Sequence, residues 1–110
     1  MQYEDFEKID MRLGEIIDVE GFPKARVPTY KVKVNFGEKI GIKNSSVQAK
    51  SVYTVEQLLG KQVIAVVNLP EKNIAGFMSQ VLILGVRMHD DSLSLLEPSR
   101  KPAQLGSKVY

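Results

Sequence analysis

The sequence predicts a mainly β protein folded as a small five-stranded barrel with short helices. Residues 29–36 (TYKVKVNF) alternate between apolar and polar side chains, which is typical of a strand with one buried face. Two further runs, residues 63–67 and 81–84, are short, rich in valine or leucine and bounded by turn residues. Such runs are typical of strands buried on both faces, because flanking glycine, proline and asparagine favour a strand over a buried helix.

Size and composition predict one domain. We place its core at about residues 8–97, with extensions at 1–8 and 98–110. The 15 basic residues exceed the 13 acidic ones by only two, a charge that permits nucleic-acid binding without arguing for it. The chain contains no cysteine, which excludes disulfides and thiolate sites. It shows no apolar run of about 20 residues and no signal-peptide pattern, so we expect a cytoplasmic protein without membrane insertion.

The first half of the chain predicts a short helix, a long strand and a hairpin. Residues 3–9 place two apolar side chains three apart among acidic ones, which favours a helix. Residues 10–19 suit a long, bent strand in which Gly14 marks a bulge or a close backbone approach. A Gly-Glu turn then joins residues 29–36 to a second hairpin strand at residues 39–43.

The second half predicts another helix and three more strands. Residues 44–60 carry few strand signals, but Thr54 and Gln57 can form the capping box of a short helix. The two apolar strands follow, joined by residues 68–79, which we expect to be a polar loop and the working surface of the protein. Residues 93–96 form the last expected strand.

This order of elements describes an OB-type Greek-key barrel. Its first strand is long and coiled, and a helix separates the third strand from the fourth. An SH3-like barrel is the main alternative, but that fold normally lacks the helix.

Several motifs resemble those of the tRNA-binding domain family, the OB-folds found at the C-terminus of some methionyl-tRNA synthetases and in free-standing relatives. Residues 10–16 (DMRLGEI) resemble its D-x-R-x-G-x-I opening, and residues 68–79 resemble its N-L…I-x-G…S segment. Within the family, residues 25–28 (ARVP), 35–37 (NFG) and 41–48 (GIKNSSVQ) are similar to the CsaA branch of small export-related chaperones. The similarity extends over essentially the whole chain.

The resemblance implies an OB-fold barrel in a homodimer whose interface is built by the two extensions. It also implies binding of unfolded or pre-export polypeptides, with tRNA as the alternative partner. Two departures bear on tRNA: residues 22–28 lack the aspartate and lysine of the tRNA-binding pattern, and Glu71-Lys72 replaces a basic pair. Each lost phosphate contact weakens binding and lowers its dependence on salt.

The candidate RNA-binding residues are Arg12, Lys31, Lys33, Lys43, Asn68, Lys72 and Ser79. Arg12 could contact a phosphate, or it could pair with Asp10 or Glu15. Asn68 and Ser79 could read nucleotides at the strand ends, or they could close the loop by hydrogen bonds to the backbone. The lysines of the hairpin would form a basic strip if they share one face.

The candidate peptide-binding residues are Phe77, Met78 and Tyr53. Phe77 and Met78 fall in the expected loop, where an exposed apolar pair would suit extended peptides because methionine adapts to varied side chains. They could instead pack into the barrel end or a dimer interface. Tyr53 and Phe77 are also the aromatic residues available to stack on bases.

Catalytic patterns are lacking in the sequence. His89 is the only histidine and stands beside two aspartates in an expected turn, without a second histidine or a cysteine to complete a metal site. There is also no glycine motif that would cradle a phosphate. We therefore expect a binding module that needs no cofactor and performs no catalysis.

Overall fold

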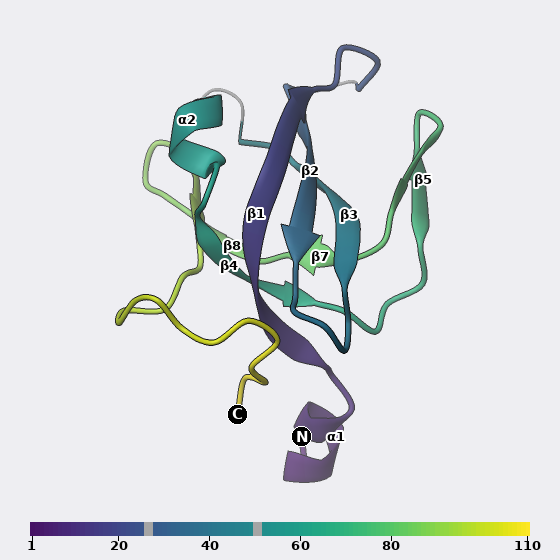
Figure 1. Cartoon of the computed structure of the whole chain (residues 1–110), viewed down its shortest axis with the longest axis vertical. Coiled ribbons are helices and arrows are strands. Elements are labelled where there is room, and N and C mark those ends of the chain that lie inside the picture. Colours follow the sequence, from purple (N-terminus) through teal and green to yellow (C-terminus); the bar gives the residue numbers. More distant parts are fainter. Residues whose placement is uncertain (26–27, 50–51) are drawn as a thin grey trace.

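A computed structural model describes residues 1–25, 28–49 and 52–110, and it confirms the OB-type barrel (Figure 1). Arg26 and Val27 of the ARVP motif lie outside the described residues. The helices and strands are α1 (Tyr3–Glu7), β1 (Met11–Gly21), β2 (Tyr30–Asn35), β3 (Ile42–Val47), α2 (Val55–Leu58), β4 (Gln62–Val66), β5 (Lys72–Ile74), β6 (Phe77–Ser79), β7 (Leu82–Ile83), β8 (Gly85–Arg87) and β9 (Leu93–Leu95).

The barrel strands follow the order β3-β2-β1-β4-β7, and every neighbouring pair is antiparallel. Helix α2 lies between β3 and β4, as in an OB-fold, and the Thr54–Gln57 capping box predicted for it is present. The barrel encloses a core whose largest fully buried side chains are Phe36, Ile16, Leu58, Val32, Val34 and Val63. Neither helix in the described ranges is long and apolar enough to cross a membrane.

Strand β1 serves both halves of the barrel. It pairs with β4 through residues 11–15 and with β2 through residues 15–21. The β1–β2 register shifts between Ile16 and Asp18, so the irregularity lies after Gly14 rather than at it. Gly14 is instead a position of close packing, because a Cβ there would lie 2.4 Å from Cγ1 of Val34. Of the two sequence-based readings of Gly14, close approach is correct and the bulge is wrong.

The second hairpin strand lies further along the chain than predicted. Gly37 and Gly41 both have positive φ angles, and Gly41 donates a backbone hydrogen bond of 2.7 Å to Gly37. The turn therefore extends to residue 41, and β3 covers Ile42–Val47 instead of residues 39–43. The polar sequence KNSS within β3 lacks the apolar alternation of a strand. Ser45 takes a buried position that an apolar side chain would normally occupy.

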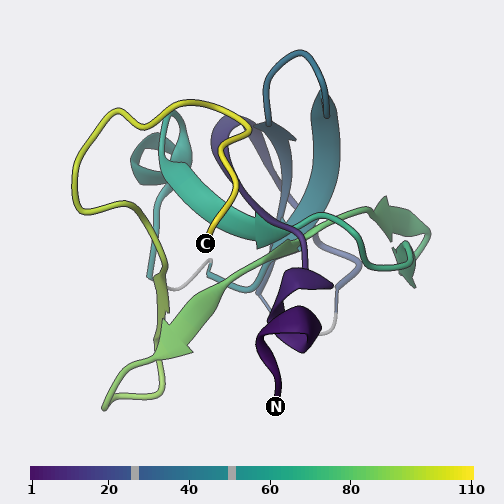
Figure 2. The ribbon, with the colours of Figure 1, turned by 90° about the horizontal axis from the view of Figure 1, so that it is seen from below.

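The segment expected to be a loop, residues 68–79, contains the hairpin β5–β6. The apolar run that follows, residues 81–84, contributes only the two residues of β7 to the barrel. Leu82 is 50% exposed, so the prediction of a strand buried on both faces is wrong for this run. The chain then forms the hairpin β8–β9, which extends from the opposite side of the barrel to β5–β6 (Figure 2).

The C-terminal tail folds back along β1 of its own barrel (Figures 1 and 2). Leu13 accepts a backbone hydrogen bond from Gly106 and donates one to Ser107, and Val109 donates one to Met11. The tail thus pairs with the first half of β1 on the edge that β2 leaves free.

Candidate functional site

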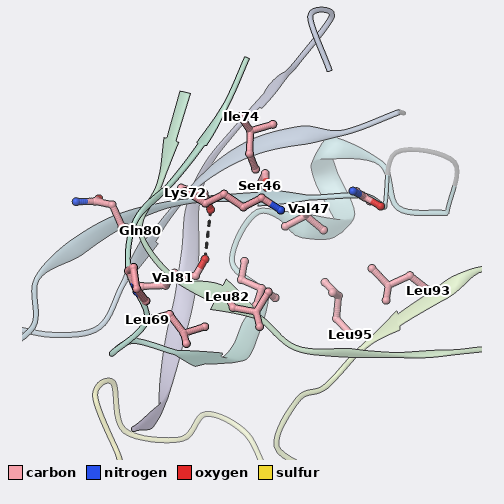
Figure 3. A pocket seen from close by; sticks show the side chains of 14 residues that line it. Ser46, Val47, Leu69, Lys72, Ile74, Gln80, Val81, Leu82, Leu93 and Leu95 are labelled. Atoms are coloured by element: carbon pink, nitrogen blue, oxygen red, sulfur yellow. Dashed lines mark hydrogen bonds between the residues drawn. The ribbon is translucent and has the colours of Figure 1, made fainter. Parts of the chain in front are cut away.

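A groove of about 340 Å³ lies between β3 and β7, beneath the hairpin β5–β6; we call it the β3–β7 groove (Figure 3). Its apolar walls come from β3, β5, β7 and β9 and from the turn after β4. The main apolar lining residues are Val47, Leu69, Ile74, Leu82, Leu93 and Leu95. Leu69 and Leu82 are about half exposed, so part of the apolar wall is accessible from solvent.

Hydrogen bonds join β3 to the chain that enters β7 beside the groove. Asn44 accepts a backbone hydrogen bond of 2.8 Å from Gln80, and the side chain of Gln80 accepts one of 2.9 Å from the Asn44 N–H. Next to these two hydrogen bonds, the buried Ser45 hydroxyl donates to the Val81 carbonyl at 3.0 Å. Among the described residues no ladder pair is assigned between β3 and β7 themselves.

Lys72 is the cationic side chain of the groove. Its chain runs along the groove in the direction of Val47 (Figure 3). The neighbouring carboxylate, Glu71, accepts a hydrogen bond of 3.3 Å from the Gln80 side chain. Among the described residues Lys72 has no ion-pair partner, so the groove combines apolar walls with one unmatched positive charge.

Phe77 and Met78 point to opposite faces of the hairpin, because they are consecutive residues of β6 rather than part of a loop. Phe77 faces the barrel, where its ring packs edge-on against Phe22 with centroids 5.6 Å apart. The ammonium of Lys31 lies 5.3 Å from the Phe77 ring centroid and 4.6 Å from that of Phe22. Met78 is 40% exposed on the outer face. The two residues therefore do not form one apolar pair.

Tyr53, which lies just before α2, is hydrogen-bonded to β2 and β9. Its hydroxyl accepts a hydrogen bond from the Leu95 N–H at 3.1 Å, and its carbonyl accepts one from the Tyr30 hydroxyl at 2.9 Å. Figure 1 shows α2 and β5 on opposite sides of the barrel. The structure thus does not bring Tyr53 together with Phe77 and Met78.

The lysines of the β2–β3 hairpin do not share one face. Lys31 is paired across the ladder with Ser46, and Lys33 with Asn44, but Lys43 is opposite the buried Val34. Residues opposite each other in a ladder project to the same side of the sheet, so Lys43 points away from the other two lysines. The three lysines therefore do not meet the condition for a common basic strip.

Acidic residues of β1 offset the positive charges of Lys31 and Lys33, the two lysines that share a face. Glu20 is opposite Lys31 and Asp18 is opposite Lys33 in the β1–β2 ladder. The Lys31 ammonium lies 3.9 Å from the Glu20 carboxylate. This face of the sheet consequently carries no excess of positive charge along the β1–β2 ladder.

Arg12 makes contacts within the chain. Its Nε donates to the Asp10 carboxylate at 2.6 Å, and its Nη1 donates to the Gly106 carbonyl at 3.1 Å. Of the readings that the sequence left open, pairing with Asp10 is the one observed. Arg12 thereby ties the start of β1 to the C-terminal tail.

Asn68 and Ser79 also bind backbone groups. The Asn68 side chain accepts a hydrogen bond from the Asp10 N–H at 3.0 Å and donates one to the Lys8 carbonyl at 2.7 Å. The buried Ser79 hydroxyl donates to the Val81 carbonyl at 3.3 Å. Asn68 thus fastens α1 to the barrel, while Ser79 lines the groove together with Lys72. The structure therefore brings Lys72 and Ser79 together at the groove, and it brings Lys31 and Phe77 together beside the barrel.

The apolar walls of the groove were missed by sequence reasoning. Leu82 belongs to a run that was predicted to be buried on both faces, and Leu93 to the last predicted strand. Leu69 between Asn68 and Pro70 was the available signal, because an apolar residue inside a turn is unusual.

The described ranges contain no cluster of three or more histidine, cysteine or acidic residues that could hold a metal ion. The two carboxylates with shifted pKa values, Glu97 and Asp90, do not line the groove. The pKa of Glu97 is lowered by hydrogen bonds from Lys101 and Lys61, and that of Asp90 by hydrogen bonds from Ser92. His89 is exposed in the turn between β8 and β9.

Comparison with curated proteins places the sequence among tRNA-binding domains. The model of the putative tRNA-binding domain family matches residues 11–108. The methionine–tRNA ligase of Nanoarchaeum equitans is 40% identical over 99% of this chain, and that of Pyrococcus horikoshii is 38% identical over 99%. The chain spans only 13% and 14% of the length of these two ligases.

Two CsaA structures are among those that match the chain over its full length. The CsaA chaperone protein of Picrophilus torridus is 44% identical with a TM-score of 0.93, and 99% of that chain is covered. The CsaA chaperone of Bacillus anthracis is 39% identical with a TM-score of 0.92, and 98% of it is covered. The chain therefore belongs to the tRNA-binding domain family, in its CsaA branch.

Proposed function

We propose that the protein is a non-catalytic chaperone that binds non-native or pre-export polypeptides in the cytoplasm. The observation that carries this proposal is the β3–β7 groove, part of whose apolar wall is accessible from solvent. Two CsaA chaperones with closely similar structures support it. Binding is passive, because each Å² of apolar client surface removed from water contributes about 25 cal/mol without requiring a particular sequence.

We further propose that the protein acts as a homodimer through its two chain ends. Tyr3 in α1 is 66% exposed, Ile9 is 42% exposed and Tyr110 is fully exposed, so apolar surface is available at both ends. Two linked grooves would bind one unfolded chain with higher avidity than a single groove. Light scattering on the purified protein tests this: a mass of two chains is expected, and a Tyr3→Ser, Ile9→Ser variant should shift the mass towards one chain.

tRNA binding is the second candidate, and the family model and the methionine–tRNA ligases favour it. The charges argue against it in this chain. Lys31 and Lys33 face acidic residues, and Arg12 is engaged with Asp10. Since phosphate contacts supply most of the non-specific affinity for nucleic acid, a surface without excess positive charge should bind tRNA weakly.

The deciding experiment is fluorescence anisotropy with labelled tRNA over a salt series, using an unfolded polypeptide as competitor. We expect weak tRNA binding and tight binding of the labelled polypeptide. Steep salt-dependent tRNA binding that the polypeptide cannot displace would instead establish the tRNA function and overturn the chaperone proposal.

Leu82→Ser tests the groove as the polypeptide site, with Leu59→Ser as the matched control. Both leucines are similarly exposed, 50% and 45%, but Leu59 follows α2 on the other side of the barrel. Polypeptide affinity should fall only in the Leu82 variant. An equal loss in both variants would contradict the assignment of the groove.

A further inference from the structure

A second surface of the barrel, formed by β1, β2 and β3, carries its charges in two rows across the sheet. Residues opposite each other in a ladder project to the same side, so side chains from all three strands share this surface. The rows consist of Glu20, Lys31 and Ser46, and of Asp18, Lys33 and Asn44. We call this surface the β1–β3 face.

A hollow of about 190 Å³ lies at the β1–β3 face. Five residues of the two rows line it, together with an aromatic residue of β6: Asp18, Glu20, Lys31, Lys33, Asn44 and Phe77. The Lys31 ammonium lies 5.3 Å from the centroid of the Phe77 ring. OB-folds bind oligonucleotides on the face of their second and third strands, where lysines meet phosphates and aromatic rings stack on bases. The hollow therefore combines the groups that a single-stranded nucleic acid requires.

The charges around the hollow cancel, because two lysines are matched by two carboxylates. The Lys31 ammonium lies 3.9 Å from the Glu20 carboxylate. Lys33 has no ion-pair partner among the described residues, but Asp18 lies directly opposite it in the ladder. A phosphate that approached Lys33 would approach Asp18 as well, well within the Debye length of about 10 Å at 0.1 M salt.

We propose that Asp18 and Glu20 determine which class of partner the protein accepts, by keeping single-stranded nucleic acid off the β1–β3 face. Without these carboxylates, the hollow offers phosphates two uncompensated lysines beside a ring on which a base stacks. Specificity of this kind comes from a repulsive element rather than from a better fit to the accepted partner. The proposal goes beyond the chaperone function, because neither carboxylate lines the β3–β7 groove.

The two carboxylates can be neutralised without disturbing the barrel. Both Asp18 and Glu20 are exposed, and the Glu20 side chain keeps 65% of its surface accessible. Exposed ion pairs such as that of Glu20 with Lys31 contribute little to stability. Asp18→Asn and Glu20→Gln therefore remove the charges and keep the size of the side chains.

The test is fluorescence anisotropy with labelled oligouridylate, an RNA without base-paired structure, over a salt series. The Asp18→Asn, Glu20→Gln double variant should bind about tenfold more tightly than the wild type at low salt, and each single variant about threefold. The slope of log affinity against log salt should steepen by about 1.4, because two added phosphate contacts contribute about 0.7 each. An unchanged affinity in the double variant would overturn the proposal.

The matched control is the Glu38→Gln, Glu56→Gln double variant, which changes the net charge equally at exposed positions in the β2–β3 turn and in α2. It should bind oligouridylate as the wild type does. Lys33→Gln, added to the Asp18→Asn, Glu20→Gln variant, should reverse most of the gain. An equal gain in the control, or a gain that survives Lys33→Gln, would show that the two carboxylates do not guard this face.

Binding of an unfolded polypeptide by the same proteins separates this proposal from the chaperone function. The polypeptide should bind the wild type and the Asp18→Asn, Glu20→Gln variant equally. If it does so and no gain in RNA affinity appears, the chaperone function stands and the role of the carboxylates is wrong. If the gain appears and no polypeptide binds, the reverse holds.

Discussion

Gln62 and Ala103 form a reciprocal pair of hydrogen bonds that fastens the C-terminal tail to β4. The Gln62 Nε2 donates to the Ala103 carbonyl at 2.8 Å, and its Oε1 accepts from the Ala103 N–H at 2.8 Å. Gln62 is only 7% exposed, so the side-chain amide replaces water at a partly buried stretch of backbone.

Gln62→Ala should loosen the tail. The variant leaves two backbone groups of Ala103 unpaired, which costs about 1–3 kcal/mol of the free energy of unfolding. Urea denaturation measures the loss, and amide hydrogen exchange should rise over residues 103–109. Gln104→Ala is the control, because Gln104 is exposed and its side chain makes no hydrogen bond to the described residues. Unchanged exchange in the tail of Gln62→Ala would contradict the role assigned to this pair.

Gly14→Ala should destabilise the barrel by about 1–3 kcal/mol through overpacking. The added Cβ would lie 2.4 Å from Cγ1 of Val34 and 2.7 Å from Cε1 of Phe36. Combining it with Val34→Ala removes the nearest of these atoms. Thermal unfolding of the four proteins in this cycle should show that the double variant loses less stability than the two single losses added together. Simple additivity would mean that the strand relaxes away from Val34.

Phe77→Ser should lower stability, whereas Met78→Ser should leave it nearly unchanged. Phe77 packs against Phe22 and lies beneath the Lys31 ammonium, and its removal should cost about 1–2 kcal/mol. Met78, the adjacent residue of the same strand, faces outward. Chemical denaturation of both variants tests this difference. Equal stability losses would show that both faces of the hairpin are packed.

Glu97 should contribute to the pH dependence of the free energy of unfolding. Hydrogen bonds from Lys101 and Lys61 lower the pKa of Glu97 in the folded protein. A lowered folded pKa contributes stability above the unfolded pKa, and this contribution is lost as pH falls through the folded pKa. Glu97→Gln should therefore be less stable than the wild type at neutral pH, by less than about 1 kcal/mol for an ion pair near the surface, and the difference should close in acid. Glu38→Gln, at an exposed position in the β2–β3 turn, should show no such convergence.

The barrel could be predicted from sequence because its central strands follow simple patterns. The alternation of β2 and the apolar run of β4 both reflect burial directly. The Thr54–Gln57 capping box identified α2 because its two hydrogen bonds are local. The bounds of β3 were mispredicted because its inward residue is the polar Ser45. The Ser45 hydroxyl is hydrogen-bonded to the carbonyl of Val81, a residue 36 positions away.

The candidate site was less predictable, because its residues are defined by what lies opposite them. The sequence could not show that Lys43 faces Val34, or that Glu20 approaches Lys31. The groove is lined by segments that are far apart in the sequence, such as β3 and β7, whose hydrogen bonds between Asn44 and Gln80 the sequence did not indicate. Lys72 was identified as a candidate, but the leucines around it were not.

The tail that runs along β1 makes the order of synthesis relevant to folding. Arg12 and Gly106, which are 94 positions apart, meet across this junction. During translation the first half of β1 must wait for the last residues of the chain before its second edge is covered. Non-local pairing of this kind slows folding and leaves a strand edge exposed in the nascent chain. A ribosome-bound chain ending before residue 104 should thus be prone to edge-to-edge association, even with every barrel strand already synthesised.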